Sequence, residues 1–233
     1  MSKSGTNIAY GYDSDGKRIT KTVNGTAYNY HYLGDQLVEL TWGGNKLHFT
    51  YDSTGPLSVN CNGTEYFYVK NAQGDVTGLV NASGTRVVTY TYDAWGNLLS
   101  TTGTMATTLG EQNPLRYRGY VYDTETGLYY LQSRYYNPGW GRFINADDAA
   151  LLLSSPGKAH WDKNVFAYCD NNPLNRVDED GECWDIIIGG IVGGIVSGAS
   201  SIVNDAIMGR ETTVGSVQMS GGAGFAAGML TAA

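Results

Sequence analysis

Short runs of alternating polar and apolar residues, separated by turn-forming residues, dominate the first half of the chain. In the run TYTYDAWGNLLST (89–101), Tyr90 and Tyr92 are two positions apart and therefore share one face of a strand. Asp93 begins a turn, where its carboxylate can accept a hydrogen bond from the backbone two residues on. Gly96 can adopt the positive φ that closes a hairpin, and the apolar run then resumes. The pattern predicts one β-hairpin.

The same pattern returns along the chain, with Tyr-Asp pairs that begin at positions 12, 51, 92 and 122. Weaker copies lie around Tyr32 and Tyr68, which gives a period of about twenty residues, the length of one hairpin. Stacked hairpins bury a continuous apolar layer that no single unit forms alone. We therefore expect consecutive antiparallel hairpins over residues 8–145, with the turn residues Asp13, Gly16, Asp52, Gly55, Asp93 and Gly96.

Composition supports this mainly β assignment. The 233 residues include 32 glycines and 18 tyrosines, and only 16 % are charged. Tyrosine favours strands and glycine favours turns, so a helical bundle and a coiled coil are disfavoured. Ordinary disorder is disfavoured by the aromatic content. A formal net charge of -7 argues against nucleic acid as a partner, because proteins that bind it carry a basic patch.

The cysteines and histidines indicate no metal or cofactor site. Cys61, Cys169 and Cys183 fit no zinc-binding spacing and no disulfide framework, which favours free buried thiols. The three histidines stand alone in the sequence, at positions 31, 48 and 160. The first residues lack the apolar run of a signal peptide. We therefore expect no metal, no cofactor and no signal peptide in this chain.

Three regions differ in composition: the hairpins at 8–113, a region rich in aromatic residues and arginine at 114–182, and a Gly/Ala-rich segment at 183–233. Residues 186–203 carry no charge, which meets the minimum length of a membrane-spanning helix. Two interpretations stay open for this last segment. One is membrane contact through residues 186–208, and the other is a buried helical hairpin or a linker ahead of a toxin domain. No catalytic motif of a toxin is visible in it.

Residues 114–148 read PLRYRGYVYDTETGLYYLQSRYYNPGWGRFINADD, and residues 164–182 read NVFAYCDNNPLNRVDEDGE. These motifs resemble the RHS repeat-associated core of the RHS/YD-repeat family, and the Tyr-Asp units resemble the family's YD repeats. The resemblance implies a mainly β fold, in which antiparallel hairpins spiral into a hollow shell and a compact core plugs one end. A small Gly-rich α-helical tail would follow. In the family, the shell encloses a variable C-terminal toxin.

The resemblance also implies that the core can cut the chain at its own C-terminal edge, with aspartates arranged as in an aspartic protease. This autoproteolysis is the one enzymatic activity that the sequence suggests. We expect the two aspartates to lie close together with the arginine nearby. On the matching motifs, the catalytic residues are Asp147, Asp178 and Arg134, and the cleavage site comprises Gly181, Glu182 and Cys183.

The sequence departs from the family's motifs near this site. Asp148 and Glu179 stand where the family has proline, and Glu182 stands where it has leucine. Two carboxylates at one peptide bond can share a proton, so that one donates to the carbonyl while the other activates water. A charged glutamate at the cut is costly to desolvate. We therefore expect any cleavage to be favoured at low pH.

We interpret the chain as the C-terminal part of an RHS-type polymorphic toxin, which encapsulates or presents a C-terminal toxin. The expected partners are the upstream shell, the toxin cargo and its cognate immunity protein, and the parent protein would be secreted or at the cell surface. One alternative is a cell-surface adhesion protein whose Tyr-rich sheet contacts carbohydrate, with no catalytic activity. Another is a degraded cassette without any activity.

Overall fold

The computed structural model describes residues 2–3, 5–147, 164–178 and 180–181. The chain forms two units, one of residues 1–168 and 179–182 and the other of residues 169–178 and 183–233. The first unit contains two antiparallel sheets, and the strands of each follow one another in chain order. The mainly β fold that the sequence predicts is therefore confirmed.

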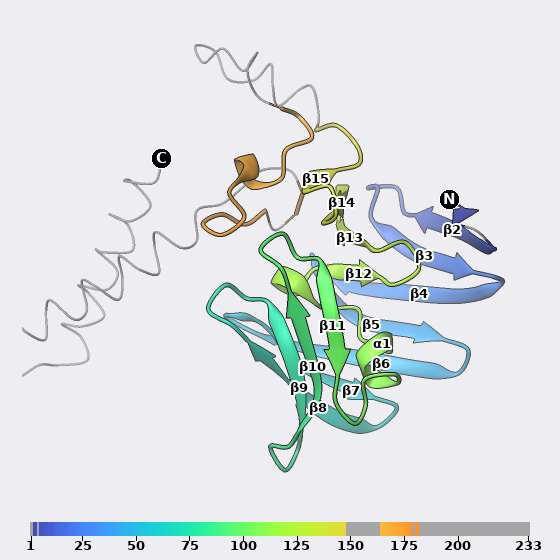
Figure 1. Ribbon diagram of the computed structural model, residues 1–233. Helices are drawn as coiled ribbons and strands as arrows, with labels where there is room; N and C mark the ends of the chain where they lie inside the picture. Colours follow the sequence, from blue (N-terminus) through green and yellow to red (C-terminus); the bar gives the residue numbers. More distant parts are fainter. Residues whose placement is uncertain (1, 4, 148–163, 179, 182–233) are drawn as a thin grey trace, which may run out of the picture. The chain divides into compact units, whose positions relative to one another are not determined.

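The larger sheet is a meander of eleven strands, each paired with its neighbours in the sequence (Figure 1). Antiparallel strands can be joined directly by tight turns, which permits this order. The strands are β1 Ser2–Lys3, β2 Thr6–Tyr12, β3 Arg18–Val23, β4 Thr26–Leu33, β5 Gln36–Trp42, β6 Asn45–Asp52, β7 Gly55–Cys61, β8 Thr64–Lys70, β9 Val76–Asn81, β10 Arg86–Tyr92 and β11 Leu98–Thr102.

A β-bulge recurs at the same place in successive hairpins. The pairing register shifts directly before Tyr12, Tyr32, Tyr51 and Tyr92. In the hairpin β8–β9 the shift falls before Lys70, and Asn71 then accepts the backbone hydrogen bonds of the turn. In the Tyr-Asp repeats the turn begins directly after the tyrosine. In this weaker copy the turn begins at Asn71, three residues after Tyr68. Each bulge increases the twist of its strand, which helps the sheet to curve.

Aspartate side chains close the turns of the repeats. Asp93 Oδ1 accepts hydrogen bonds from the N–H groups of Trp95 at 2.8 Å and Asn97 at 2.9 Å. Asp13 and Asp52 accept equivalent bonds from the backbone two residues on. The glycine that stands three residues after each of these aspartates has a positive φ. The Tyr-Asp-x-x-Gly spacing thus supplies both the hydrogen bonds and the backbone freedom that the turn needs.

The repeat tyrosines tie each hairpin to the one before it. Tyr51 Oη donates to the carbonyl of Leu37 at 2.8 Å, and Tyr92 Oη donates to that of Val76 at 2.9 Å. Leu37 lies in β5 and Val76 in β9, each the second strand of the preceding hairpin. Burial raises the pKa of both tyrosines, because it disfavours the charged phenolate. Each ring therefore contributes apolar area, and its hydroxyl bonds the preceding hairpin.

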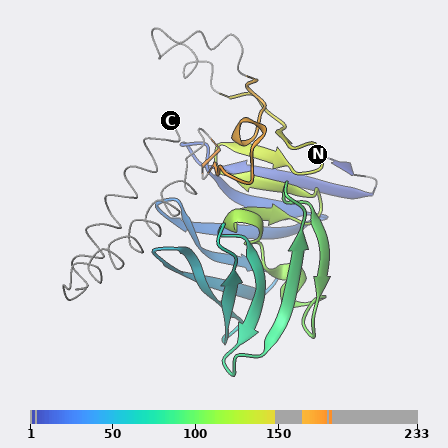
Figure 2. The same cartoon turned by 60° about the vertical axis from the view of Figure 1, so that its left-hand side comes forward.

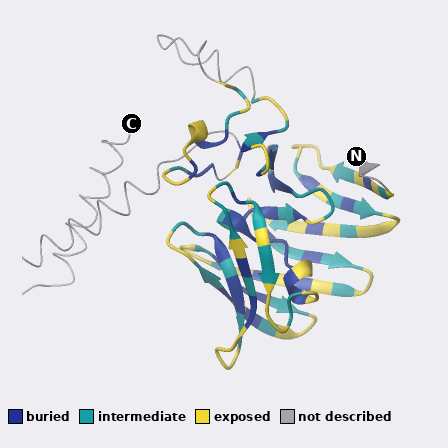
Figure 3. Cartoon of the chain, viewed as in Figure 1, coloured by how far each residue is buried: buried dark blue, intermediate teal, exposed yellow. Residues whose placement is uncertain are grey.

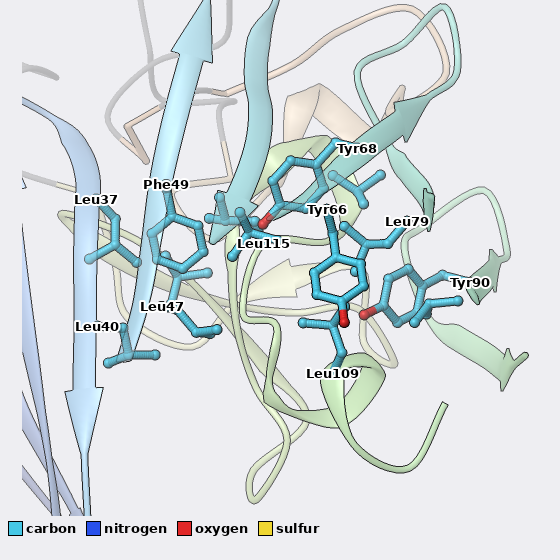
Figure 4. Close-up of a cluster of buried hydrophobic side chains, with 14 of the residues drawn as sticks. Leu37, Leu40, Leu47, Phe49, Tyr66, Tyr68, Leu79, Tyr90, Leu109 and Leu115 are labelled. Atoms are coloured by element: carbon cyan, nitrogen blue, oxygen red, sulfur yellow. The ribbon is translucent and has the colours of Figure 1, made fainter. Parts of the chain in front are cut away.

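One apolar core lies against the larger sheet (Figure 3). Leucine and aromatic side chains of β5–β10 meet Leu109 and Leu115, which belong to the segment after β11 (Figure 4). That segment includes the single-turn helix α1, Leu109–Gln112. Tyr90 Oη donates to the carbonyl of Gly110 at 2.8 Å and so fixes the segment on the sheet. Each fully buried leucine stabilises the fold by about 1.5–3 kcal/mol.

A second antiparallel sheet of four strands follows, and we refer to it as the core sheet. Figures 1 and 2 both show it beside the first hairpins of the larger sheet. Tyr129 and Tyr136 at its centre are fully buried, and their rings stack with centroids 6.3 Å apart. Its strands are β12 Val121–Asp123, β13 Leu128–Leu131, β14 Arg134–Asn137 and β15 Arg142–Phe143.

The described part of the second unit comprises residues 169–178. It begins with a 3-10 helix at Cys169–Asn171, and the N–H of Asn172 donates to the carbonyl of Cys169 at 2.9 Å. Arg176 and Asp170 form an ion pair within the unit.

The Gly/Ala-rich segment 183–233 lies outside the described residues. Its helical tail and the membrane contact through 186–208 therefore stay predictions. Within the described part of the chain, no helix has the length and apolar character needed to cross a membrane.

Candidate active site

Arg134 stands at the start of β14 and is only 5 % exposed. Its guanidinium carbon lies 3.7 Å from the ring centroid of Phe143. Nη1 lies 3.0 Å from Asp147 Oδ2 and donates to the carbonyl of Val165 at 3.3 Å, and Nε donates to the carbonyl of Gly181. The planar guanidinium therefore joins three segments that are distant in the sequence.

Asp147 follows β15, and its side chain is 24 % exposed. Its N–H donates to the carbonyl of Val165 at 3.1 Å, the same carbonyl that accepts from Arg134. The backbone of Asp147 is therefore held beside the arginine that binds its side chain. The ion pair with Arg134 orients one carboxylate oxygen, and the exposure leaves the carboxylate within reach of water. Asp147 is thus suited to accept a proton from a water molecule.

The other expected site residues are placed differently. Asp178 is buried but belongs to the second unit, whereas Arg134 and Asp147 belong to the first. The structure therefore joins Arg134 to Asp147, and the expected approach of Asp178 to Asp147 stays a prediction. Glu182 and Cys183, on either side of the expected cut, lie outside the described residues.

Residues 180–181 lie on the turn between β13 and β14. Ser133 Oγ donates to the carbonyl of Asp180 at 2.8 Å, and the Ser133 N–H reaches the same oxygen at 3.2 Å. Gly181 has a φ of +81°, and a Cβ there would lie 2.7 Å from Ser133 Oγ and 2.8 Å from the carbonyl oxygen of Leu131. The position therefore requires glycine for its backbone angle and for its lack of a side chain.

A buried group of charges fastens the core sheet to the first hairpin. Asp123 of β12 is completely buried, and its carboxylate lies 2.5 Å from Arg18 Nη1 and 3.1 Å from Lys21 Nζ. Lys21 also pairs with Glu125 at 2.9 Å. We refer to these four residues as the ionic clasp. Its two cations and two anions compensate one another, which buried charges require.

Four tyrosine rings surround the guanidinium of Arg18. This arrangement adds cation–π attraction to the ion pair with Asp123. Burial is the largest single influence and opposes the charge on Arg18, but the carboxylate of Asp123 and the neighbouring tyrosines together outweigh it, and the pKa of Arg18 is raised. The distances from the guanidinium carbon to the ring centroids are 4.5 Å for Tyr130, 4.7 Å for Tyr30, 5.3 Å for Tyr10 and 5.8 Å for Tyr135.

Tyrosines of residues 114–147, which we call the core region, also hold the turn of the last hairpin. Gly96 in this turn has a φ of +85°, and a Cβ there would lie 2.6 Å from the ring of Tyr117. The core region is therefore tied to both the first and the last hairpin of the larger sheet. Three hydroxyls donate to successive carbonyls, Tyr117 to Ala94 at 3.1 Å, Tyr136 to Trp95 at 2.7 Å and Tyr129 to Gly96 at 2.9 Å.

Neither the ionic clasp nor the role of Ser133 could be predicted from the sequence pattern. Asp123 did carry a signal, because it belongs to the last Tyr-Asp pair, but the repeat pattern gave it no role of its own. Its carbonyl does accept the N–H of Gly127 at 2.8 Å, while its carboxylate points into the buried clasp. Ser133 lies within the motif 114–148 but was assigned no role, and its contact with Asp180 joins residues 47 positions apart.

Within the described ranges, no group of three or more His, Cys, Asp or Glu side chains could hold a metal ion. Cys61 is a free thiol, but it is half-buried, whereas the sequence analysis expected a buried one. It lies at the end of β7 and packs against the apolar core while staying partly exposed.

The family model of the teneurin YD-shell matches residues 1–174. The tRNA3(Ser)-specific nuclease WapA of Bacillus spizizenii is 45 % identical over 187 residues. The tRNA(Glu)-specific nuclease WapA of Bacillus subtilis subsp. natto is 44 % identical over 187 residues. Each alignment covers 78 % of this chain but 8 % of the relative, so the chain spans a small part of the relatives' length.

Among solved structures, the crystal structure of TcdB2-TccC3-Cdc42 is similar, with a TM-score of 0.59 and 20 % sequence identity. The match covers 78 % of this chain and 9 % of the other chain. At this identity the likeness concerns the fold, and it extends over most of the chain.

Proposed function

Because the chain belongs to the teneurin YD-shell family, we propose that it forms the closing end of an RHS-type shell around a C-terminal toxin. The support is its architecture: hairpins tied to one another by their tyrosines, and a core sheet tied to the first and the last of them. The chain spans 8 % of the length of its WapA relatives. The remainder of the shell would come from repeats upstream in the parent protein.

The relatives support a toxin as the cargo. The two WapA nucleases are named for different tRNAs, yet this chain matches both almost equally. The matching part therefore does not select the target, as expected for a shell that accepts different cargoes. This favours the toxin-related function over carbohydrate contact. The partners would be the upstream shell, the toxin and its immunity protein, and the parent protein would be secreted or at the cell surface.

The proposal includes cleavage of the chain after Glu182 by its own core. The observation that carries this part is the position of Arg134, which contacts both the carboxylate of Asp147 and the carbonyl of Gly181. One cation thus connects a water-accessible carboxylate with the carbonyl of the second residue before the expected cut. An arginine at such a place orients the base and fixes the substrate segment together.

In the proposed reaction, the carboxylate of Asp147 accepts a proton from water while the water oxygen adds to the carbonyl carbon of Glu182. Asp178, in its neutral form, donates a proton to the carbonyl oxygen. The bond between the Glu182 carbon and the Cys183 nitrogen then breaks, and the nitrogen takes up the proton that Asp147 gained. The hydroxyl proton returns to Asp178. The products are a carboxyl group on Glu182 and an amine on Cys183, and both aspartates regain their starting states.

Retention of the C-terminal piece tests the shell function separately from the cut. An Asp147→Asn chain with a specific protease site inserted after Glu182 is digested and passed over a gel-filtration column. We expect residues 183–233 to elute with residues 1–182 and to separate only in denaturant, because a shell end must keep its cargo after the bond is broken. Elution of the C-terminal piece as a separate small species under native conditions would contradict this function.

A further inference from the structure

We propose that Ser133 is a positioning residue that sets the register of the chain ahead of the cut. The proposal rests on the proposed self-cleavage after Glu182. Ser133 holds the carbonyl of Asp180 with two donors, its hydroxyl at 2.8 Å and its backbone N–H at 3.2 Å. The N–H is shared with the carbonyl of Leu131 at 2.7 Å, so the hydroxyl is the donor that Asp180 has to itself. Arg134 holds the next carbonyl, that of Gly181, through Nε. Two successive carbonyls of the substrate segment are thus bound by two successive residues, Ser133 in the β13–β14 turn and Arg134 at the start of β14.

The turn that carries these donors is itself fixed. Leu131 pairs directly with Arg134, so Gln132 and Ser133 alone join β13 to β14. Gln132 has a φ of +61°, and its side chain donates to the carbonyl of Asp35 at 3.3 Å, in the turn between β4 and β5. The donors therefore sit on a short, anchored hairpin. Groups held in place before the reaction lose little entropy when they orient a substrate.

Gly181 makes this arrangement specific for one register. A Cβ at its position would lie 2.7 Å from Ser133 Oγ, 2.8 Å from the Leu131 carbonyl oxygen and 3.2 Å from the Arg134 nitrogen. A slip by one residue would bring the side chain of Asp180 or Glu182 into this space. Two of the three obstacles are backbone atoms, which cannot turn away. The segment is therefore accepted only with glycine at the second position before the cut.

The role of Ser133 can be separated from folding. Ser133 is exposed, whereas Arg134 is buried among several partners. Ser133→Ala removes the hydroxyl but keeps the backbone N–H, so it deletes one of the two donors to Asp180. We expect this variant to fold normally. Ser133→Thr keeps a hydroxyl on the same carbon and is the conservative variant. Ser53→Ala alters another exposed serine in a hairpin turn and serves as the matched control.

The experiment follows the intact mass of the full chain over time and compares the rate of the cut. Ser133→Ala should slow the cut by roughly two- to tenfold, the effect of one net hydrogen bond. Ser133→Thr and Ser53→Ala should cut at the wild-type rate. The thermal midpoint of each variant and the pH profile of the cut should stay unchanged, because Asp147 and Arg134 are intact. Gly181→Ala should abolish the cut.

The outcomes distinguish the two proposals. A wild-type chain that stays uncut overturns the proposed self-cleavage and the role of Ser133 with it. A wild-type chain that is cut, with Ser133→Ala as fast as wild type, overturns only the role of Ser133. The role of Ser133 is also overturned if Ser133→Thr is cut as slowly as Ser133→Ala, because the hydroxyl would then not be what positions the chain. Normal cutting by Gly181→Ala would overturn the register argument.

Discussion

Asp123→Asn should lower the free energy of unfolding by about 3–5 kcal/mol, the usual cost of leaving a buried charge without its partner. Asp123 is the shared partner of Arg18 and Lys21, and all three are buried. In the variant, Glu125 would be the one remaining anion of the ionic clasp for its two cations. Because the clasp joins β12 to β3, we expect the core sheet to detach from the first hairpin.

Urea unfolding followed by circular dichroism measures this loss. The matched control is Asp35→Asn, the same substitution in an ion pair with Lys17 in which the aspartate side chain is 80 % exposed. That variant should lose at most about 1 kcal/mol, because exposed ion pairs contribute little. Equal losses in the two variants would contradict the clasp.

Above about pH 10 the protein should lose stability steeply and unfold near pH 11 to 12. Burial raises the pKa of many tyrosines by disfavouring the phenolate, so these residues stay neutral in the folded chain while unfolded tyrosines ionise near pH 10. Their contribution is therefore complete below about pH 10 and falls as the pH rises. Five such residues are Tyr51, Tyr68, Tyr90, Tyr92 and Tyr129.

Each of these tyrosines lowers the free energy of unfolding by about 1.4 kcal/mol for every pH unit above 10. Together they would remove the whole stability of a typical domain, about 5–15 kcal/mol, within one or two units. The absorbance of tyrosinate and the far-UV circular dichroism should therefore change together in one transition. Gradual ionisation near pH 10 with an unchanged dichroism spectrum would contradict the burial of these rings.

The hairpins could be predicted because their signals are local. A tyrosine, an aspartate and a glycine within five residues specify a strand end, a capped turn and its positive φ. The same locality explains the displaced turn after Tyr68, because tyrosines at alternate positions resemble the start of a repeat. The turn there uses Asn71 instead, which offers the same acceptor oxygen without the Tyr-Asp signature.

The contacts of the core sheet could not be predicted from the repeat pattern. Arg18 and Asp123 are 105 positions apart, and Tyr129 and Gly96 are 33 apart. Such pairs depend on how the whole sheet curves, and a repeat period of about twenty residues does not specify that curvature. The resemblance identified Arg134 and Asp147 through their motifs. It could not identify the role of Ser133, because that role depends on residues 180–181, which lie against the β13–β14 turn.

The intact mass of purified wild-type chain beside Asp147→Asn, at about pH 4 and about pH 7, tests the central proposal most directly. We predict two masses for the wild type, residues 1–182 and 183–233, with faster cutting at the lower pH because Glu182 loses its charge. The variant should give one uncut mass, because asparagine keeps the shape of the side chain but cannot accept a proton. A single uncut wild-type species at both pH values, or an equal cut in the variant, would contradict the account.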